Sequence, residues 1–461
     1  MEEKISRRLV FDGILKNEEE IFLKISDSNQ YFEKHIYNDN DENINVKNDE
    51  ITYNRPMYLT ILTKNSIYYD YYNLNTEERY NSEYYDKEYK PYLMYYVVDN
   101  IDEMKKIKEI KSRSNGDWIT AKYVENDNQR NEEECIKGNL FLNYYLKNNN
   151  KCLKIQSFDI DLDILERIKN IYYIDFEKHN IDEKYINNIN INTFPEKIKV
   201  YNVGHGNINL ISGKKSCILF DIGCHRGYNN KWKSDQNYNA ICLSINRIKP
   251  DCVVISHWDI DHYKGYGVLD KKVFSVPWIV PGLIGNSGEN IYRLLIYMHI
   301  KKSLYFLNVN KSVNYTLYTN NMIKIILKNG NGQAEDGITE KNRKGLYIEI
   351  TKENKKYLLM GDTPYKCANI NNTTYVDLLV APHHGSNTIN SNFPNPSTEK
   401  SIVVVCEKDK NVNKCNTHMN KLVKQGFDVY FVSGNKYKTR KNTKCSKWFE
   451  YDISTDTYQW I

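Results

Sequence analysis

The chain has 461 residues, and its 64 basic and 59 acidic residues nearly cancel to a formal net charge of +5. This length favours two or three domains, with two as the simplest division, each able to bury a core. The composition, with 40% hydrophobic residues and 39 tyrosines, excludes a wholly disordered chain, whereas the charge neither requires nor excludes a nucleic-acid partner. Any phosphate binding must therefore come from a local basic patch.

The sequence gives no sign of export or of membrane insertion. No apolar run is long enough to cross a bilayer, and the N-terminal stretch MEEKISRRLVF lacks the apolar core of a signal peptide. The ten cysteines are scattered without a CxxC pair, which favours small buried thiols over disulfides or a cysteine zinc site. We therefore expect a cytoplasmic protein with no membrane partner.

Residues 1–192 are rich in Tyr, Asn, Lys, Glu and Ile and contain no motif that indicates chemistry. The segments MYLTILT (57–63) and LMYYVVD (93–99) are typical of strands, whereas IDEMKKIKEIKSR (101–113) and DLDILERIKNIYYI (161–174) are typical of helices. We expect a smaller α+β domain that serves as an accessory or interaction module and offers a surface for a possible protein partner.

From residue 193 to residue 461 the pattern changes to short β-rich runs that end in Gly, Asp or His. These runs are CILFDIG (217–223), CVVISH (252–257), LYIEI (346–350), YLLMGD (357–362), DLLVAPHHG (377–385), SIVVVCE (401–407) and DVYFVSG (428–434). The helical segments NIYRLLIYMHIKKSLYFL (290–307) and HMNKLVKQG (418–426) would cover the faces of the sheets. Because polar residues at strand ends lie on loops at one sheet edge, this pattern predicts a second domain with a site along that edge.

The segment SHWDIDH places His257, Asp259, Asp261 and His262 directly after an apolar run. A polar turn with coincidental histidines is the alternative, but interleaved imidazoles and carboxylates favour a site for a divalent metal. The runs ending in LLMGD and APHHG repeat the design. A carboxylate between two imidazole-rich clusters, Asp362, could bridge two ions.

The ordered set of LFDIG, HxDxDH, LLMGD and APHHGS resembles the metallo-β-lactamase fold, an α/β four-layer αβ/βα sandwich with its metals at one edge. More narrowly, it resembles the ComEC-like branch, named after the soluble hydrolase domain of a DNA-uptake protein, in which Asp replaces the second His of HxHxDH, as Asp259 does here. The segments NVGHGNINLI, NRKGLYIEI with Asn342, and NTHMNKLVKQG with His418 match the same branch. The resemblance covers about residues 197–435.

The resemblance implies one metal site with His257 and Asp259 and a second with Asp261 and His262, bridged by Asp362. Either histidine of the APHHG segment would complete the second site, with the first of the two favoured, and a strand-end carboxylate would orient the cluster. The last ligand would be His383 or His384, and the orienting carboxylate would be Asp221. The candidate catalytic residues are Asp261, His384 and His418, with His418 as a general acid or a phosphate contact.

Two positions depart from the family pattern. The only histidine between the two clusters, His299, lies in a helical stretch and is better explained as a packed residue, so the first site would be carboxylate-rich and incomplete. This shifts the expected cofactor, one or two divalent ions per chain, from Zn²⁺ toward Mn²⁺ or Mg²⁺. Asn207 stands where related sequences carry an acidic residue, and His205 fits a site histidine and a structural turn histidine equally well.

The resemblance implies a nuclease or phosphodiesterase that cleaves DNA with a metal-activated water. Ser386 and the basic C-terminal stretch GNKYKTRKNTKCSKWFEY, with Lys436, Lys438 and Arg440, are the candidate substrate-binding residues. A solvated basic strand pair explains this stretch equally well. A hydrolase of a small phosphoester or nucleotide, and a non-enzymatic interaction protein on the same fold, are the alternatives.

Overall fold

The computed structural model describes strands and single residues between 20 and 189, and residues 195–461 with gaps. The gaps are at 204–205, 215, 224–240, 242–243, 246, 249, 264, 267–268, 270, 283–290, 292–293, 296–297, 299–302, 335–336, 390, 408–411, 434 and 438–445. The chain divides into two compact units, one mainly of residues 1–174 and the other mainly of residues 175–461. Each is described by itself.

The N-terminal unit contains an eight-stranded antiparallel sheet in the order β5-β8-β4-β1-β2-β3-β6-β7. Its strands are β1 (Glu20–Ile25), β2 (Tyr58–Thr63), β3 (Met94–Val98), β4 (Trp118–Glu125), β5 (Cys135–Ile136), β6 (Gly138–Leu142), β7 (Tyr145–Lys147) and β8 (Lys151–Ser157). The two predicted strands of this region are confirmed as β2 and β3. The predicted helix 101–113 lies outside the described residues, as does helix 161–174 apart from Glu166, and the boundary at 192/193 stays a prediction.

The C-terminal unit has two mixed sheets, and the first has the order β14-β13-β12-β11-β10-β9-β24-β25. Its strands are β9 (Lys197–Tyr201), β10 (Asn209–Ser212), β11 (Cys217–Phe220), β12 (Cys252–Val254), β13 (Trp278–Pro281), β14 (Leu304–Leu307), β24 (Trp448–Asp452) and β25 (Thr457–Trp460). Strands β11 to β14 are parallel, and the others pair antiparallel. The prediction of a helix over 290–307 is wrong at its C-terminal end. The last four residues, LYFL, form the edge strand β14, which pairs with β13.

The second sheet has the order β15-β16-β17-β18-β20-β22-β23, with its antiparallel half first and its parallel half last. Its strands are β15 (Asn314–Thr319), β16 (Ile323–Asn329), β17 (Leu346–Lys352), β18 (Lys355–Leu359), β20 (Leu378–Val380), β22 (Ile402–Val405) and β23 (Asp428–Phe431). A short pair, β19 (Tyr375–Val376) and β21 (Asn395–Pro396), lies beside it. All seven predicted β-rich runs are confirmed as strands.

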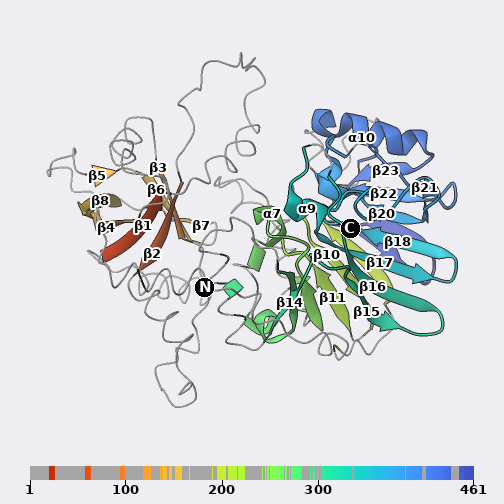
Figure 1. Ribbon diagram of the computed structural model, residues 1–461, viewed down its shortest axis with the longest axis horizontal. Coiled ribbons are helices and arrows are strands. Elements are labelled where there is room, and N and C mark those ends of the chain that lie inside the picture. Colours follow the sequence, from red (N-terminus) through yellow and green to blue (C-terminus); the bar gives the residue numbers. More distant parts are fainter. Residues whose placement is uncertain are drawn as a thin grey trace. The chain divides into compact units, whose positions relative to one another are not determined.

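The core lies between the two sheets because alternate residues of each strand point to opposite faces. Ile348 and Leu359 join residues such as Phe220 and Val254 of the first sheet in one buried cluster. The neighbours on the other face, including Leu358, belong to a second buried cluster that contains Met419 and Leu422 of α10 (Val412–Lys424). Figure 1 shows α10 along β22 and β23. The two mixed sheets packed face to face agree with the metallo-β-lactamase fold that the motifs predicted. The four layers stay a prediction, because the segments expected over the outer face of the first sheet lie largely outside the described residues.

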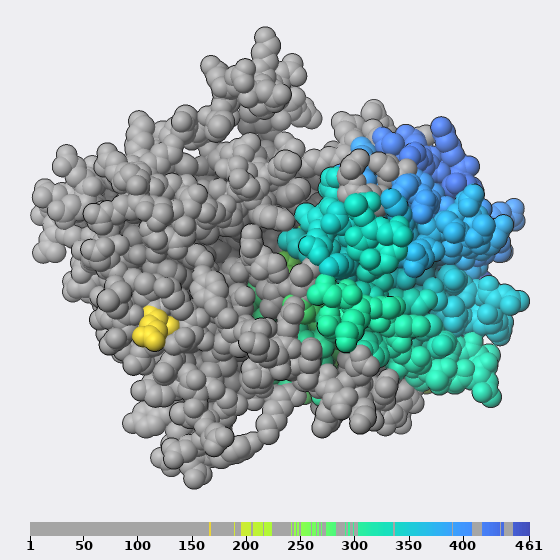
Figure 2. Space-filling model, in the orientation of Figure 1, coloured from red at the N-terminus to blue at the C-terminus, as the bar shows by residue number. Residues whose placement is uncertain are grey.

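Short helical segments connect the strands of the two sheets. They are α7 (Ile260–Tyr263), η6 (Lys271–Ser275), α9 (Glu340–Arg343) and η7 (Pro382–Gly385). On the face drawn in Figure 2, the described residues from β15 to α10 form a continuous surface coloured from green to blue. Within the described part of the chain, no helix has the length and apolar character needed to cross a membrane.

Candidate metal centre

The polar residues of the centre follow the carboxyl ends of neighbouring parallel strands. Asp221 follows β11, His257 follows β12, and Asp362 and His383 follow β18 and β20. Since β11 and β12 belong to one sheet and β18 and β20 to the other, both sheets deliver ligands to one edge of the sandwich. Buried β-rich segments thus carry their polar ends to a common place, as the sequence predicted.

The carboxylate of Asp362 is the point on which four imidazoles converge. Its Oδ2 atom lies 3.6 Å from Nε2 of His257 and 3.8 Å from Nε2 of His383. Its Oδ1 atom lies 3.0 Å from Nε2 of His262 and 3.8 Å from Nε2 of His384. Each oxygen of one carboxylate therefore faces its own pair of histidines, which is the arrangement required of a bridging ligand.

The remaining carboxylates divide the centre into two half-sites. Asp259 Oδ2 lies 3.1 Å from His257 Nε2, and Asp261 Oδ2 lies 2.9 Å from His384 Nε2. We call the group on the Oδ2 side of Asp362 the first half-site, with His257, Asp259 and His383. The group on the Oδ1 side, with Asp261, His262 and His384, is the second half-site.

The two histidines of the APHHG segment differ from the expectation. Either histidine could have completed the second site, and we favoured His383, with His384 as a catalytic candidate. The structure brings His384 to Asp261 and places His383 at the first half-site, which the sequence had left incomplete. Both residues have left-handed backbone angles, with φ of 51° and 53°. Because such angles are strained for residues other than glycine, the fold holds this turn against its intrinsic preference, and consecutive side chains reach opposite oxygens of Asp362.

Each imidazole is oriented by a partner of its Nδ1 atom, which leaves Nε2 directed into the centre. His262 Nδ1 donates to Asp221 Oδ2 over 2.7 Å, and His384 Nδ1 donates to the carbonyl oxygen of Cys406 over 2.9 Å. His257 Nδ1 lies 3.0 Å from Ser256 Oγ, and His383 Nδ1 lies 3.2 Å from Thr388 Oγ1. Such partners fix the tautomer and the direction of a metal-binding histidine.

Asp221 is the anchor behind the centre, as predicted for an orienting carboxylate. Besides His262, it accepts hydrogen bonds from Ser256 N, Ser256 Oγ and Asn207 Nδ2 over 2.7, 2.9 and 3.2 Å. Asn207 also holds the ligand loop by its backbone, since its N–H donates to Asp261 O. The asparagine that departs from the family pattern is therefore a structural support, and His205 lies outside the described residues.

Burial and charge act against each other on the titratable groups. Burial alone would raise the pKa of Asp362, but the neighbouring His262, His383 and His257 outweigh it and hold that pKa well below its usual value. Burial also raises the pKa of Asp259, but His257 and Lys341 together outweigh this effect and hold that pKa below its usual value. Both carboxylates are therefore ionised at neutral pH, as metal ligands must be.

The donor set fits divalent metal ions. Two buried triads, His257-His262-Asp362 and Asp261-His262-His384, each place their ligand atoms within 4.8 Å of one another. Both triads include His262, but the single lone pair of its Nε2 atom can bind only one ion. A centre with two ions would therefore use His262 in the second half-site and Asp362 as the ligand shared by both. Among the described residues, the buried atoms His257 Nε2, His262 Nε2 and Asp362 Oδ1 make no hydrogen bond to a group outside the centre, as expected of atoms that bind a metal.

His418 lies away from this donor set. Its Nε2 accepts from the hydroxyl of Tyr365 over 3.0 Å, its Nδ1 donates to the carbonyl oxygen of Ser386 over 3.1 Å, and its ring packs against Phe393. Burial lowers the pKa of His418 to about 3, against the weaker effect of the Ser386 carbonyl. The expected general acid is instead a neutral residue that holds the HHGS turn to α10.

The predicted substrate-binding residues are only in part described. Nζ of Lys436 forms an ion pair with Asp428 over 2.5 Å and lies 5.6 Å from the ring centre of Tyr430. The ring of Tyr437 is buried, so Tyr437 cannot stack on a base. Ser386 is half-buried, and its Oγ accepts from Thr388 Oγ1 over 3.0 Å. Lys438 and Arg440 lie outside the described residues, as does His299.

Sequence reasoning did not assign three residues that contact the centre. Ser256 lies directly before the HxDxDH motif and bridges Asp221 to His257. Lys341 forms an ion pair with Asp259 Oδ1, and Thr388 contacts His383. Ser256 and Thr388 could have been found because they flank the motifs, but nothing in the sequence relates Lys341 to Asp259.

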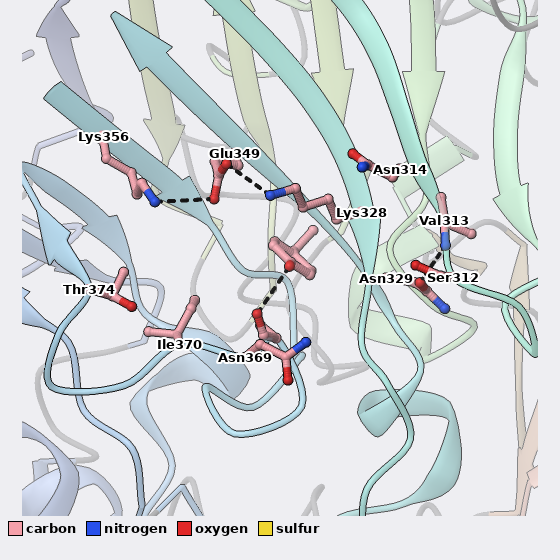
Figure 3. A pocket seen from close by; sticks show the side chains of 12 residues that line it. Ser312, Val313, Asn314, Lys328, Asn329, Glu349, Lys356, Asn369, Ile370 and Thr374 are labelled. Atoms are coloured by element: carbon pink, nitrogen blue, oxygen red, sulfur yellow. Dashed lines mark hydrogen bonds and ion pairs between the residues drawn. The ribbon is translucent and has the colours of Figure 1, made fainter. Parts of the chain in front are cut away.

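A separate polar pocket of about 370 Å³ lies on the outer face of β16, β17 and β18. At its floor, Glu349 lies between Lys328, 2.9 Å away, and Lys356, 3.6 Å away (Figure 3). Asn369 and Thr374 line its wall. None of the candidate site residues lines this pocket.

Part of the C-terminal unit matches a known protein family. Residues 201–333 match the family model described as the Metallo-beta-lactamase superfamily. The chain contains a metallo-beta-lactamase superfamily domain. The match includes the HxDxDH motif and names the superfamily, not a branch of it. No curated protein matches the chain.

Solved structures similar to this superfamily domain share little sequence with it. The metallo-beta-lactamase fold protein YhfI from Bacillus subtilis is 14% identical, with 52% of this chain and 98% of that chain covered and a TM-score of 0.29. The short form of human tRNase Z is 12% identical, with 46% and 94% covered and a TM-score of 0.26. Zn²⁺-bound PqqB from Methylobacterium extorquens is 10% identical, with 50% and 87% covered and a TM-score of 0.28. At these TM-scores the likenesses carry no argument about function.

The superfamily domain and its two buried triads support a metal-dependent hydrolase. The fold and the donor set were both expected from the motifs. The assignment of individual ligands to half-sites comes from the geometry.

Proposed function

We propose that this protein is a metal-dependent phosphodiesterase that cleaves DNA. The observation that carries the proposal is the convergence of four imidazole Nε2 atoms on the two oxygens of Asp362. A centre of this kind would hold two cations through residues on either side of Asp362, and a pair of cations would suit a reaction in which negative charge develops on phosphoryl oxygens.

In this proposal, the first half-site would hold one ion through His257, Asp259 and His383, and the second would hold another through Asp261, His262 and His384. Bound divalent ions supply an activated water and stabilise the charge on the phosphoryl group. The chain's own residues orient the ligands, because Asp221, Ser256 and the carbonyl of Cys406 fix the imidazole rings. No serine or cysteine nucleophile is required.

The preference for DNA rests on the ComEC-like order of motifs and on Asp259 in the HxDxDH segment. Together with Asp362, Asp259 gives the first half-site two carboxylates beside the imidazoles of His257 and His383, a donor set that suits Mn²⁺ as well as Zn²⁺. We propose Mn²⁺ as the first ion to test, with Zn²⁺, which the name of the PqqB structure reports, as the second.

The test is cleavage of single-stranded DNA, double-stranded DNA and bis(p-nitrophenyl) phosphate by the purified full chain with Mn²⁺, Mg²⁺ or Zn²⁺. The Asp362→Ala variant removes the bridging carboxylate, and Glu399→Gln, an exposed carboxylate before β22, is the control. We expect DNA cleavage that Asp362→Ala abolishes and Glu399→Gln leaves unchanged. Cleavage of the small diester without cleavage of DNA would favour the small-phosphoester alternative, and equal activity of Asp362→Ala would refute the centre.

A further inference from the structure

The side chains of the centre are unequally exposed to solvent. The five that line its deep side are between 0% and 3% exposed: His257, Asp261, His262, His384 and Asp362. In contrast, Asp259 is 17% exposed, Lys341 is 18% exposed and His383 is 21% exposed. Asp259, Lys341 and His383 therefore form the more exposed side of the centre, at the first half-site, and we call this side its mouth.

Lys341 stands at this mouth without occupying a ligand atom of the centre. Its Nζ forms an ion pair with Oδ1 of Asp259, whereas Oδ2 of the same carboxylate faces His257 Nε2. Asp259 can thus bind an ion with one oxygen while the other oxygen contacts the ammonium. The lysine adds a positive charge beside the first half-site and leaves its donor set intact.

The backbone that carries Lys341 is held by the centre itself. In the next residue, Asn342 Nδ2 donates to Asp362 Oδ2 over 3.3 Å, and Asn342 Oδ1 accepts from Thr339 Oγ1 over 2.8 Å. After α9, the N–H of Leu346 donates to the carbonyl oxygen of Ser256 over 2.8 Å. Figure 1 shows α7 and α9 at the same edge of the sandwich. The position of Lys341 is therefore set by the same residues that set the ligands.

We propose that Lys341 is a substrate-binding residue that contacts the anionic phosphate group at the mouth of the centre. This inference rests on the proposed phosphodiesterase function and adds to it the group that receives the substrate's charge. The ammonium of lysine is a compact positive charge and a common partner of phosphate. A fixed cation beside the reacting group attracts and orients an anionic ester, which the buried ligands of the deep side cannot do.

The test compares phosphate binding with metal binding in the same variants. The full chain loaded with Mn²⁺ is titrated with inorganic phosphate by calorimetry, after its metal content is measured, as wild type and as Lys341→Met, Lys341→Arg and Lys344→Met. Lys344 directly follows the helix that carries Lys341 but pairs with Glu340, which makes it the matched control. We expect Lys341→Met to weaken phosphate binding by about tenfold or more, the loss of one ionic hydrogen bond, with unchanged metal content. We expect Lys341→Arg and Lys344→Met to bind phosphate like the wild type.

Two results would overturn the inference. Phosphate binding by Lys341→Met that equals the wild type would show that the ammonium does not contact the anion. Loss of metal from Lys341→Met would show that Lys341 only supports Asp259. The proposed function is tested by a different experiment, the cleavage assay. If the metal-loaded wild type cleaves no diester, the proposed function fails, but the phosphate titration still tests the role of Lys341.

Discussion

Nδ1 of His262 donates a hydrogen bond to Oδ2 of Asp221 over 2.7 Å, and both side chains are fully buried. This bond assigns the proton to Nδ1 and leaves Nε2 to face Asp362, 3.0 Å away. Asp221 itself has a positive φ of 59°, so the chain turns sharply after β11 to present its carboxylate. The orientation of the second half-site thus depends on a residue that is not expected to touch an ion.

Asp221→Asn should weaken metal binding at the second half-site by roughly 10- to 100-fold, as is usual when the partner of a ligand histidine is lost. Asparagine tolerates the left-handed backbone angle, so the substitution changes the acceptor and not the turn. The measurement is competition with a chelator of known affinity. The control is Asp377→Asn, because Asp377 is also buried and accepts from Lys356 N and Ser397 Oγ, but it precedes β20. Equal metal affinity in both variants would contradict the role of Asp221.

His384→Ala and His383→Ala should have unequal effects on metal content. His384 is buried and contacts Asp261, so its loss should remove the ion of the second half-site. His383 is partly exposed at the first half-site, so its loss should leave the second ion in place. Elemental analysis of both purified variants, with chelator titration of what remains, checks the assignment. The opposite order of metal loss would restore the expectation from the sequence.

The strands and the identity of most site residues could be predicted because both are local properties of the sequence. An apolar β-rich run that ends in His or Asp indicates where a buried strand ends and its polar loop begins. The division between His383 and His384 could not be predicted, because it depends on two consecutive left-handed residues that tertiary contacts enforce. The position of Lys341 depends on a contact across 82 residues of chain between two sheets, which no local pattern contains.

His418 shows a different limit of sequence reasoning. A histidine near a helix start in a family pattern is typical of a catalytic residue, but the pattern does not state its surroundings. Tyr365 and Phe393, both distant in sequence, enclose the ring and satisfy it. Burial therefore decided between a catalytic and a structural role, and burial is not visible in the motif.

Gly361→Ala should destabilise the protein by about 2 kcal/mol more than Gly337→Ala. Both glycines have positive φ, 54° and 74°, so both substitutions carry the strain of about 1 kcal/mol that a left-handed alanine costs. At Gly361, however, the new Cβ would lie 2.7 Å from Ser256 Cβ, at the point where β18 meets the end of β12, and about 1–3 kcal/mol of overpacking adds to the strain. At Gly337 the nearest atom is 3.6 Å away. Urea unfolding of both metal-free variants measures the difference, and equal losses would contradict the close approach of the two strands.

The buried His418 should make the stability of the metal-free protein depend on pH. Its pKa is lowered from the ordinary 6.5 to about 3 by burial, so the unfolded chain binds a proton below pH 6.5 that the folded chain does not bind. Stability is therefore lost as pH falls below 6.5, by about 2 kcal/mol at pH 5, since each pH unit contributes about 1.4 kcal/mol. His418→Gln lacks this group, so the difference in unfolding free energy between wild type and variant should shrink by about 2 kcal/mol from pH 7 to pH 5. Urea unfolding at both pH values, with a chelator present, measures this difference.

Tyr365→Phe, which removes the hydroxyl partner but keeps the imidazole, should retain the wild-type slope of unfolding free energy against pH. Equal slopes for wild type and His418→Gln would mean that the buried ring is protonated in the folded protein.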